Sequence, residues 1–292
     1  MKLMFAQFDP RPQGAEANQA ILKSGMVIGI EVTIPALAQG LVNLDHHGPS
    51  DTAETPSACE QALDLQISFD KIEAATLTLA TVRPDADSVT AMAVMFNRSN
   101  GLVVDEELVH AVGRFDRFGP SAGKPEARVS AIARKACDFK VALADRVQWV
   151  ADLLAGADKL VEITELCSAH DAELEAARKA SELTLHANGR IAVVVSTHRF
   201  ATTLGYESAL VVVAMNPEMP VDPKDASKGT YRKYTVCRYD SHVKCDLPTT
   251  LKELQALEVG WGGRGDIFGS PQGISSILTV EQVIEVVSRH LK

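Results

Sequence analysis

The sequence lacks the features that mark several protein classes. Its 292 residues include five cysteines but no C-x-x-C pair, so neither a zinc ribbon nor a disulfide framework is predicted. The longest apolar runs, at 191–196 and 208–215, are strand-sized and far shorter than a membrane span. The start, MKLMFAQFDP, has too short an apolar run for a signal peptide. We therefore expect a soluble protein of the reducing cytoplasm, with no membrane partner.

Basic residues are also in the minority. The chain has 29 Lys and Arg against 38 Asp and Glu, which gives a formal net charge of −9. This balance argues against a protein that holds long nucleic acid by broad neutralisation of its phosphates. A short anionic substrate is still compatible, because a local metal site can outweigh the global charge.

What the sequence does contain, in its first half, is an alternation of short apolar runs with helical patterns. Such alternation indicates a parallel sheet that is covered on both faces. Strands are predicted at 2–8, 25–32, 40–45 and 75–82, and helices at 55–65 and 88–98. The sequence thus predicts an α/β protein with a parallel-sheet N-terminal domain (1–140), a helical linker (141–187) and a smaller mixed α/β C-terminal domain (188–292).

Acidic and imidazole side chains stand at the ends of the predicted strands. In open α/β sheets, ligands bind beyond the carboxyl ends of the strands. Mixed oxygen and nitrogen ligands that converge there suit two divalent cations such as manganese. A single Asp at a strand–helix junction is commonly an N-cap, and Asp87 has that second interpretation. The side chains in question are Asp45, His46, His47, Asp85, Asp87 and Glu31.

The stretch NLDHHG (43–48), followed by ETPSACEQAL (54–63), resembles the signature motif of the DHH phosphoesterase superfamily. The C-terminal half is similar to the DHH-associated domain, in which a strand with an arginine, here Arg238 in YTVCRYDS, precedes a helix and a glycine-rich loop. The family's loop reads roughly G-G-G-G-H-P-x-A-A-G, and GWGGRGDIFGS stands in its place. The resemblance covers nearly the whole chain and implies a metal-dependent phosphoesterase.

The resemblance also implies roles for individual residues. Asp45, His46, Asp85 and Asp87 would bind Mn²⁺ (or Mg²⁺), two ions if the site is intact, and Glu31 stands near the position of the family's bridging aspartate. Asp45 and His47 would be catalytic, with His47 near the phosphate oxygens. The substrate would be held, across a cleft between the domains, by Arg238, Gly262, Gly263 and Arg264.

The chain departs from the family at its first motif, H-x-x-x-D-x-D. Gln7, Arg11 and Gln13 stand where the histidine and the two aspartates belong. The stretch TVRPDADSVTAM carries two aspartates at the right spacing, with Thr81 in the histidine's place, so a displaced and a degenerate first motif are both open. Alternatively, Asp85 stands for the family's fourth-motif aspartate, which also ends a strand. Asp116, in VGRFDRFGP, is interpreted as a solvated acid in a loop.

Two functions are compatible with these patterns. The first is a metal-dependent phosphoesterase that acts on a small phosphorylated substrate, such as a short oligonucleotide, a cyclic dinucleotide or polyphosphate. The second is a catalytically degenerate relative that binds a nucleotide or another anion. The sequence decides neither the substrate nor whether the chain forms a homodimer.

Overall fold

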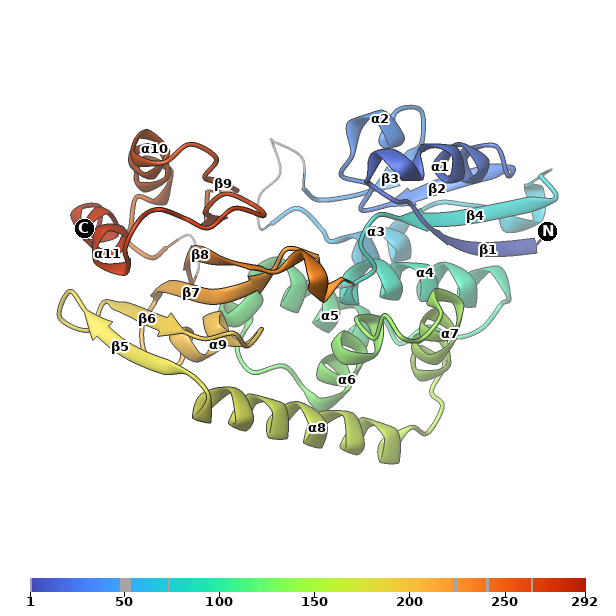
Figure 1. Cartoon of the computed structure of the whole chain (residues 1–292). Helices are drawn as coiled ribbons and strands as arrows, with labels where there is room; N and C mark the ends of the chain where they lie inside the picture. Colours follow the sequence, from blue (N-terminus) through green and yellow to red (C-terminus); the bar gives the residue numbers. More distant parts are fainter. Residues whose placement is uncertain (1, 48–53, 73, 223–224, 240–241, 264) are drawn as a thin grey trace. The chain divides into compact units, whose positions relative to one another are not determined.

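The computed structural model describes residues 2–292 except 48–53, 73, 223–224, 240–241 and 264 (Figure 1). The chain divides into two compact units, residues 1–170 and 171–292. The first unit contains a parallel sheet and the second a mixed sheet, which confirms the predicted α/β class.

The sheet of the first unit has the strand order β1-β4-β2-β3, and every neighbouring pair is parallel. All four strands coincide with predicted apolar runs. Because the strands are parallel, their carboxyl ends meet at one edge, where Gln7 pairs with Thr81 and Ile30 with Leu44. The strands are β1 (Lys2–Gln7), β2 (Met26–Ile30), β3 (Val42–Leu44) and β4 (Thr76–Thr81).

Helices cover both faces of this sheet (Figure 1). One face packs against α1 (Ala15–Leu22) and α2 (Pro35–Ala38) through a small apolar cluster. The other face packs against the main core, in which α4 (Ala86–Ser99) buries most of its residues. The remaining helices of this unit are α3 (Ala58–Asp64), α5 (Glu106–Phe118), α6 (Ala127–Ala136), α7 (Leu143–Leu154) and the first part of α8 (Leu160–Lys179).

The second unit is built on a six-stranded sheet of order β5-β6-β7-β8-β10-β9, in which the pair β6–β7 is parallel and the other pairs are antiparallel. Its buried valines pack on one side against α10 and α11 and on the other against α9. The strands are β5 (Glu182–His186), β6 (Ile191–Val195), β7 (Val211–Pro220), β8 (Thr230–Arg238), β9 (Gly262–Gly263) and β10 (Ile267–Gly269). The helices are α9 (Ala201–Tyr206), α10 (Leu247–Leu257) and α11 (Val280–Arg289).

Short 3-10 turns complete the described elements, at Pro12–Gly14, Phe69–Lys71, Gly119–Ala122 and Ala226–Lys228. None of the helices in the described residues is both long enough and apolar enough to cross a bilayer.

The structure differs from the sequence-based expectation at three places. The stretch expected as a helical linker contains α7, whose Val147 and Val150 lie in the core of the first unit. The same stretch ends in strand β5, an edge strand with an exposed pattern that the sequence did not reveal. Asp116, expected in a loop, lies in the last turn of α5.

Candidate metal centre

Glu31 is held at the end of β2 by an unusual backbone conformation. Its φ of 51° lies in the left-handed region, which costs a non-glycine residue free energy. The turn is fixed from β3, where the Asn43 side chain accepts a hydrogen bond from the Val32 N–H (3.1 Å) and donates one to the Val32 carbonyl (3.2 Å). Gly29 makes room for this amide, because a Cβ there would lie 2.6 Å from Asn43 Oδ1. Both strands thus serve to place one buried carboxylate.

The triplet of Asp45, His46 and His47 follows directly after β3, and its three side chains have different surroundings. His46 is turned inward, with its side chain 9% exposed, whereas the side chain of His47 is 31% exposed. Asp45 Oδ1 lies 2.9 Å from His47 Nδ1 and also accepts the His47 N–H at 3.0 Å. Asp45 therefore orients His47 and leaves the other ring nitrogen of His47 for a further contact.

Asp85 and Asp87 lie at the start of α4. Asp85 is the N-cap, because its Oδ1 accepts from the Ser88 N–H (3.0 Å) and from the Ser88 hydroxyl (2.7 Å). Asp87 is fully buried and accepts hydrogen bonds from the backbone N–H groups of Ala58 (2.7 Å) and Cys59 (2.9 Å). The N-cap interpretation therefore applies to Asp85, and Asp87 joins the first turn of α4 to that of α3.

Helix α5 supplies a further carboxylate, Asp116. Val109, Val112 and Gly113 form the buried face of α5, and Asp116 follows at the same helical spacing. Next to it, Arg117 Nε lies 3.0 Å from Oε2 of Glu60, a residue of α3. The Asp116 side chain is 23% exposed, but its Oδ2 lies 3.0 Å from His46 Nε2, so Asp116 is paired with an imidazole and is not simply a solvated acid in a loop.

These side chains converge on one imidazole nitrogen. His46 Nε2 lies 3.0 Å from Asp116 Oδ2, 3.4 Å from Glu31 Oε1 and 3.9 Å from Asp87 Oδ2. Ligand atoms of these four residues all lie within 4.8 Å of one another, and Glu31, His46 and His47 form a second, overlapping group. Three carboxylate oxygens and one imidazole nitrogen at this spacing can hold a divalent cation.

Burial and crowding shift the pKa values of these groups. Burial raises the pKa of Glu31 well above its ordinary value, and although His46 opposes the shift, Asp85, Asp87 and Asp116 add to it by repulsion. Burial, followed by repulsion from Asp116, also raises the pKa of Asp87. For His46, burial works in the opposite direction, but the neighbouring Asp116 and Glu31 raise its pKa to about 10. A positive charge at this position, such as a proton on His46, is therefore stabilised by the surrounding carboxylates.

The pKa of Asp45 moves the other way. Burial would raise the pKa of this carboxyl, but its contacts with the side chain and the N–H of His47 outweigh burial and lower the pKa. Asp45 is thus a carboxylate paired with His47, and it is absent from both groups of the described residues that could hold a metal ion.

The end of β1 carries different chemistry. The Gln7 amide donates to the Val82 carbonyl at 3.2 Å, and Arg11 forms a bidentate pair with Asp9 at 2.8 and 2.7 Å. The Thr81 hydroxyl is buried and has no hydrogen-bond partner among the described residues. None of Gln7, Arg11 and Thr81 offers a carboxylate or an imidazole to a cation.

The residues predicted to bind substrate lie in the second unit. Arg238 ends β8, and its guanidinium donates to the Cys245 carbonyl at 3.2 Å. Gly262 and Gly263 form the short exposed strand β9, and Gly263, at φ 150°, approaches Phe268 so closely that a Cβ would lie 2.5 Å from its Cα. Arg264 lies outside the described residues.

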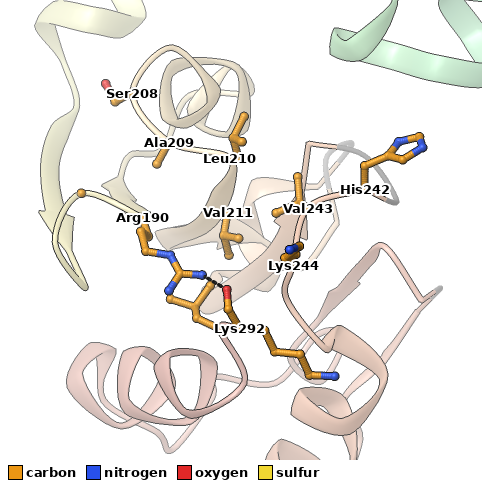
Figure 2. A pocket seen from close by; sticks show the side chains of 11 residues that line it. Arg190, Ser208, Ala209, Leu210, Val211, His242, Val243, Lys244 and Lys292 are labelled. Atoms are coloured by element: carbon orange, nitrogen blue, oxygen red, sulfur yellow. Dashed lines mark hydrogen bonds between the residues drawn. The ribbon is translucent and has the colours of Figure 1, made fainter.

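The second unit also contains a pocket of about 450 Å³. Arg190, Lys244 and Lys292 stand around it together with the apolar Leu210 and Val243 (Figure 2). The Arg190 guanidinium donates to the main-chain carbonyl of Lys292 and is thereby engaged within the unit. None of the predicted site residues that the structure describes lines this pocket.

No protein-family model matches the chain, and no curated protein sequence is significantly similar to it. Solved structures do match. One is a pGpG-specific phosphodiesterase, PggH, from Vibrio cholerae, with 9% identity and a TM-score of 0.41 over 99% of this chain and 97% of that one. Another is the DHH domain of a protein from a family of ribosomal proteins, with 13% identity and a TM-score of 0.35 over 69% of this chain and 48% of that one.

Both TM-scores lie below 0.5, so the proposed chemistry rests on the residues of this chain.

Proposed function

We propose that this protein is a metal-dependent phosphoesterase that hydrolyses a small phosphorylated substrate. The observation that carries the proposal is the convergence of Glu31, Asp87 and Asp116 on His46. Such a cluster, at the carboxyl ends of parallel strands, lies where open α/β proteins bind their ligands. Its mixed oxygen and nitrogen donors suit Mn²⁺.

The donor set fits a cation because it is incomplete without one. Glu31 Oε1 is buried and accepts no hydrogen bond from the described residues. Among those residues, the ion-pair partners of Glu31, Asp87 and Asp116 are imidazoles and no Lys or Arg. Buried carboxylates without compensation are costly, so the site favours positive charge.

When bound, a divalent cation polarises a phosphoryl oxygen and acidifies a water molecule. The chain's own contribution is positioning. Asp87 is fixed by two backbone N–H groups and Glu31 by its turn, so both carboxylates are held before a ligand arrives. His47, oriented by Asp45 through Nδ1, presents its Nε2, which bonds to no other described residue, to a proton or a phosphoryl oxygen. Arg238 and the backbone of Gly262 and Gly263 would hold the remainder of the substrate.

The test is hydrolysis of bis-p-nitrophenyl phosphate by the purified protein with Mn²⁺. The natural substrate class is then sought among pyrophosphate, polyphosphate, short oligonucleotides and cyclic dinucleotides. Activity that requires Mn²⁺, disappears with EDTA and is lost in Asp87→Asn supports the proposal. Protein that binds no Mn²⁺ and cleaves none of these substrates when Mn²⁺ is added contradicts it.

The second candidate is a non-catalytic relative that binds a nucleotide or another anion. It is favoured by the end of β1, where Gln7 and the Asp9–Arg11 pair replace metal-binding chemistry. Binding of a nucleotide that does not depend on Mn²⁺, together with no hydrolysis, would identify this function.

A further inference from the structure

We infer that the centre holds a single divalent cation, and that Asp116 of α5 is one of its ligands together with Glu31, His46 and Asp87. The inference deepens the proposed function and rests on it for the presence of a metal. It replaces the two ions that the family resemblance implies by one. It also assigns Asp116 as a ligand, although Asp116 lies far from Asp45, His46 and His47 in the sequence.

The four donors have the spacing of a single coordination site. Each residue contributes one ligand atom, and these atoms lie within 4.8 Å of one another. Two oxygen ligands of one cation are separated by less than about 5 Å, because each lies about 2.0–2.6 Å from the ion. The four side chains therefore satisfy the spacing for one ion without any change of backbone.

Glu31 has an acceptor atom that lacks a donor. Its side chain is 6% exposed, and Oε1 faces His46 Nε2 at 3.4 Å and His47 Nδ1 at 3.6 Å without a hydrogen bond from the described residues. Buried polar atoms are normally satisfied, so such an atom points to a ligand. This oxygen points into the cluster around His46. The cation that would satisfy it therefore lies in the same position as the cation that the four residues would bind.

The overlapping group of Glu31, His46 and His47 does not provide a second site. It shares two members with the first group and adds one imidazole, whose Nδ1 is already 2.9 Å from Asp45 Oδ1. A nitrogen atom has one lone pair and ligates one cation, so Nε2 of His46 cannot serve two. The two groups are therefore alternative ligand sets for one ion, and the four-residue set offers more donors.

The last residues of β4 and of β1 offer neither a carboxylate nor an imidazole to a second cation. The neighbouring strand β4 ends in Thr81, and β1 beyond it ends in Gln7, which pairs with Thr81 in the register. The Gln7 amide is bonded to a main-chain carbonyl, and the nearby Asp9 carboxylate is neutralised by Arg11. A second cation there would thus meet a hydroxyl, an amide and a carboxylate that is already paired with Arg11. Among the described residues, the groups that could hold a metal ion all include His46.

Asp116 is positioned for its role by contacts that do not involve the metal. Gly113 lets α5 approach α3, and Arg117 pairs with Glu60 at 3.0 Å. These contacts precede and follow Asp116 on the helix, so its carboxylate is aimed at His46 by packing. A ligand supplied from a helix in this way compensates for the donors that β1 lacks.

The experiment measures metal stoichiometry and does not depend on activity. The full-length protein is stripped with EDTA, equilibrated with Mn²⁺, desalted and analysed for metal, and the affinity is measured by isothermal titration calorimetry. Electron paramagnetic resonance of the loaded protein distinguishes an isolated Mn²⁺ from a coupled pair. We expect one Mn²⁺ per chain and the spectrum of an isolated ion.

The variant Asp116→Asn keeps the shape and removes the charge, and we expect it to weaken Mn²⁺ binding by about tenfold or more, since even outer-shell changes cost about 10–100-fold in metal affinity. Glu107→Gln is the matched control, because Glu107 is an exposed acid on the same helix. It should bind Mn²⁺ as the unmodified protein does, and circular dichroism confirms the folding of both variants.

The outcomes distinguish the single-ion inference from the proposed function. Two coupled Mn²⁺ ions per chain would overturn the single-ion inference while leaving a metal-dependent phosphoesterase in place. One Mn²⁺ with unchanged affinity in Asp116→Asn would remove Asp116 from the ligand set. Absence of Mn²⁺ binding would overturn this inference and the proposed function together.

Discussion

A Cβ atom on Gly113 would lie 2.7 Å from Cγ of Glu60, so α5 reaches α3 at a distance that no larger residue allows. The same atom would lie 2.5 Å from Ser57 Oγ, in the capping box that starts α3. Asp116 follows one turn after Gly113 and approaches His46 to 3.0 Å. The close packing of two helices therefore determines the position of a proposed metal ligand.

Replacing Gly113 by alanine should weaken both folding and metal binding. The extra methyl group must displace α5 or the α3 cap, and such overpacking costs about 1–3 kcal/mol. The displacement should carry Asp116 away from His46 and reduce the affinity for Mn²⁺, measured by calorimetry alongside urea unfolding. Gly265→Ala is the control, since a Cβ there would make only an ordinary contact of 3.8 Å. Equal Mn²⁺ affinity in the two variants would show that α5 does not position the site.

Much of the first unit could be predicted from sequence because its chemistry is local. The four parallel strands fall on the predicted apolar runs, and the two central strands, β2 and β4, are buried along most of their length. Glu31, His46 and Asp87 stand just beyond β2, β3 and β4. The ends of neighbouring parallel strands meet at one edge, so these residues could be expected to lie together.

Asp116 could not be placed in this way. Its approach to His46 depends on the packing of α5 against α3, which is a contact between segments far apart in the chain. The signal that was available is the spacing of Val109, Val112, Gly113 and Asp116, which puts the acid on the buried face of an amphipathic helix. Strand β5 was missed for a different reason: as an edge strand with exposed side chains, it lacks an apolar run.

Glu60 should make the stability of the protein depend on pH. Burial opposes ionisation of Glu60, but the Ser57 N–H, His110 and Arg117 outweigh it and lower the pKa below the ordinary value of 4.5. A lowered pKa in the folded state gives stability that is present above pH ~4.5 and is lost as the pH falls through the folded-state pKa. Glu60→Gln should therefore cost about 1.5–3 kcal/mol at neutral pH, because hydrogen bonds to a charged group are lost.

The cost of Glu60→Gln should shrink toward zero in acid. Urea unfolding of both proteins at a series of pH values from neutral to about pH 3 measures it. Glu107→Gln serves as the exposed control and should show little change at any pH. A cost for Glu60→Gln that is the same in acid and at neutrality would mean that the glutamine side chain fits poorly at this position and that the charge of Glu60 contributes nothing.

Replacing His46 should mainly weaken Mn²⁺ binding, whereas replacing His47 should mainly lower kcat/KM. His46 is buried with Nε2 among carboxylates, so His46→Ala should weaken Mn²⁺ binding by about tenfold or more. His47 is more exposed and is held by Asp45, so His47→Ala should keep most of the Mn²⁺ affinity and lower kcat/KM by about 100-fold, the range of a lost proton-transfer group. Metal analysis and hydrolysis of bis-p-nitrophenyl phosphate separate the two effects. Full activity and metal content in both variants would reduce the triplet to a surface turn and contradict the proposed enzyme.

Glu31 should lower the free energy of unfolding, because a strained backbone conformation places its carboxylate in the site. Its φ of 51° is a conformation that costs an L-residue about 1 kcal/mol and costs glycine little, and its carboxylate is buried among other acids. We expect Glu31→Gly to abolish Mn²⁺ binding and, in EDTA, to unfold at a higher urea concentration than Glu31→Ala. The alanine variant is the matched control, because both changes remove the carboxylate and only glycine relieves the backbone. A difference of about 1 kcal/mol in favour of glycine, despite the greater freedom of glycine in the unfolded chain, would show that the turn after β2 stores strain in order to aim a ligand. A glycine variant that is less stable than the alanine variant by about 0.4–1 kcal/mol, the cost of glycine's freedom in the unfolded chain, would show instead that the left-handed conformation is without cost at this position and that Asn43 alone holds the turn.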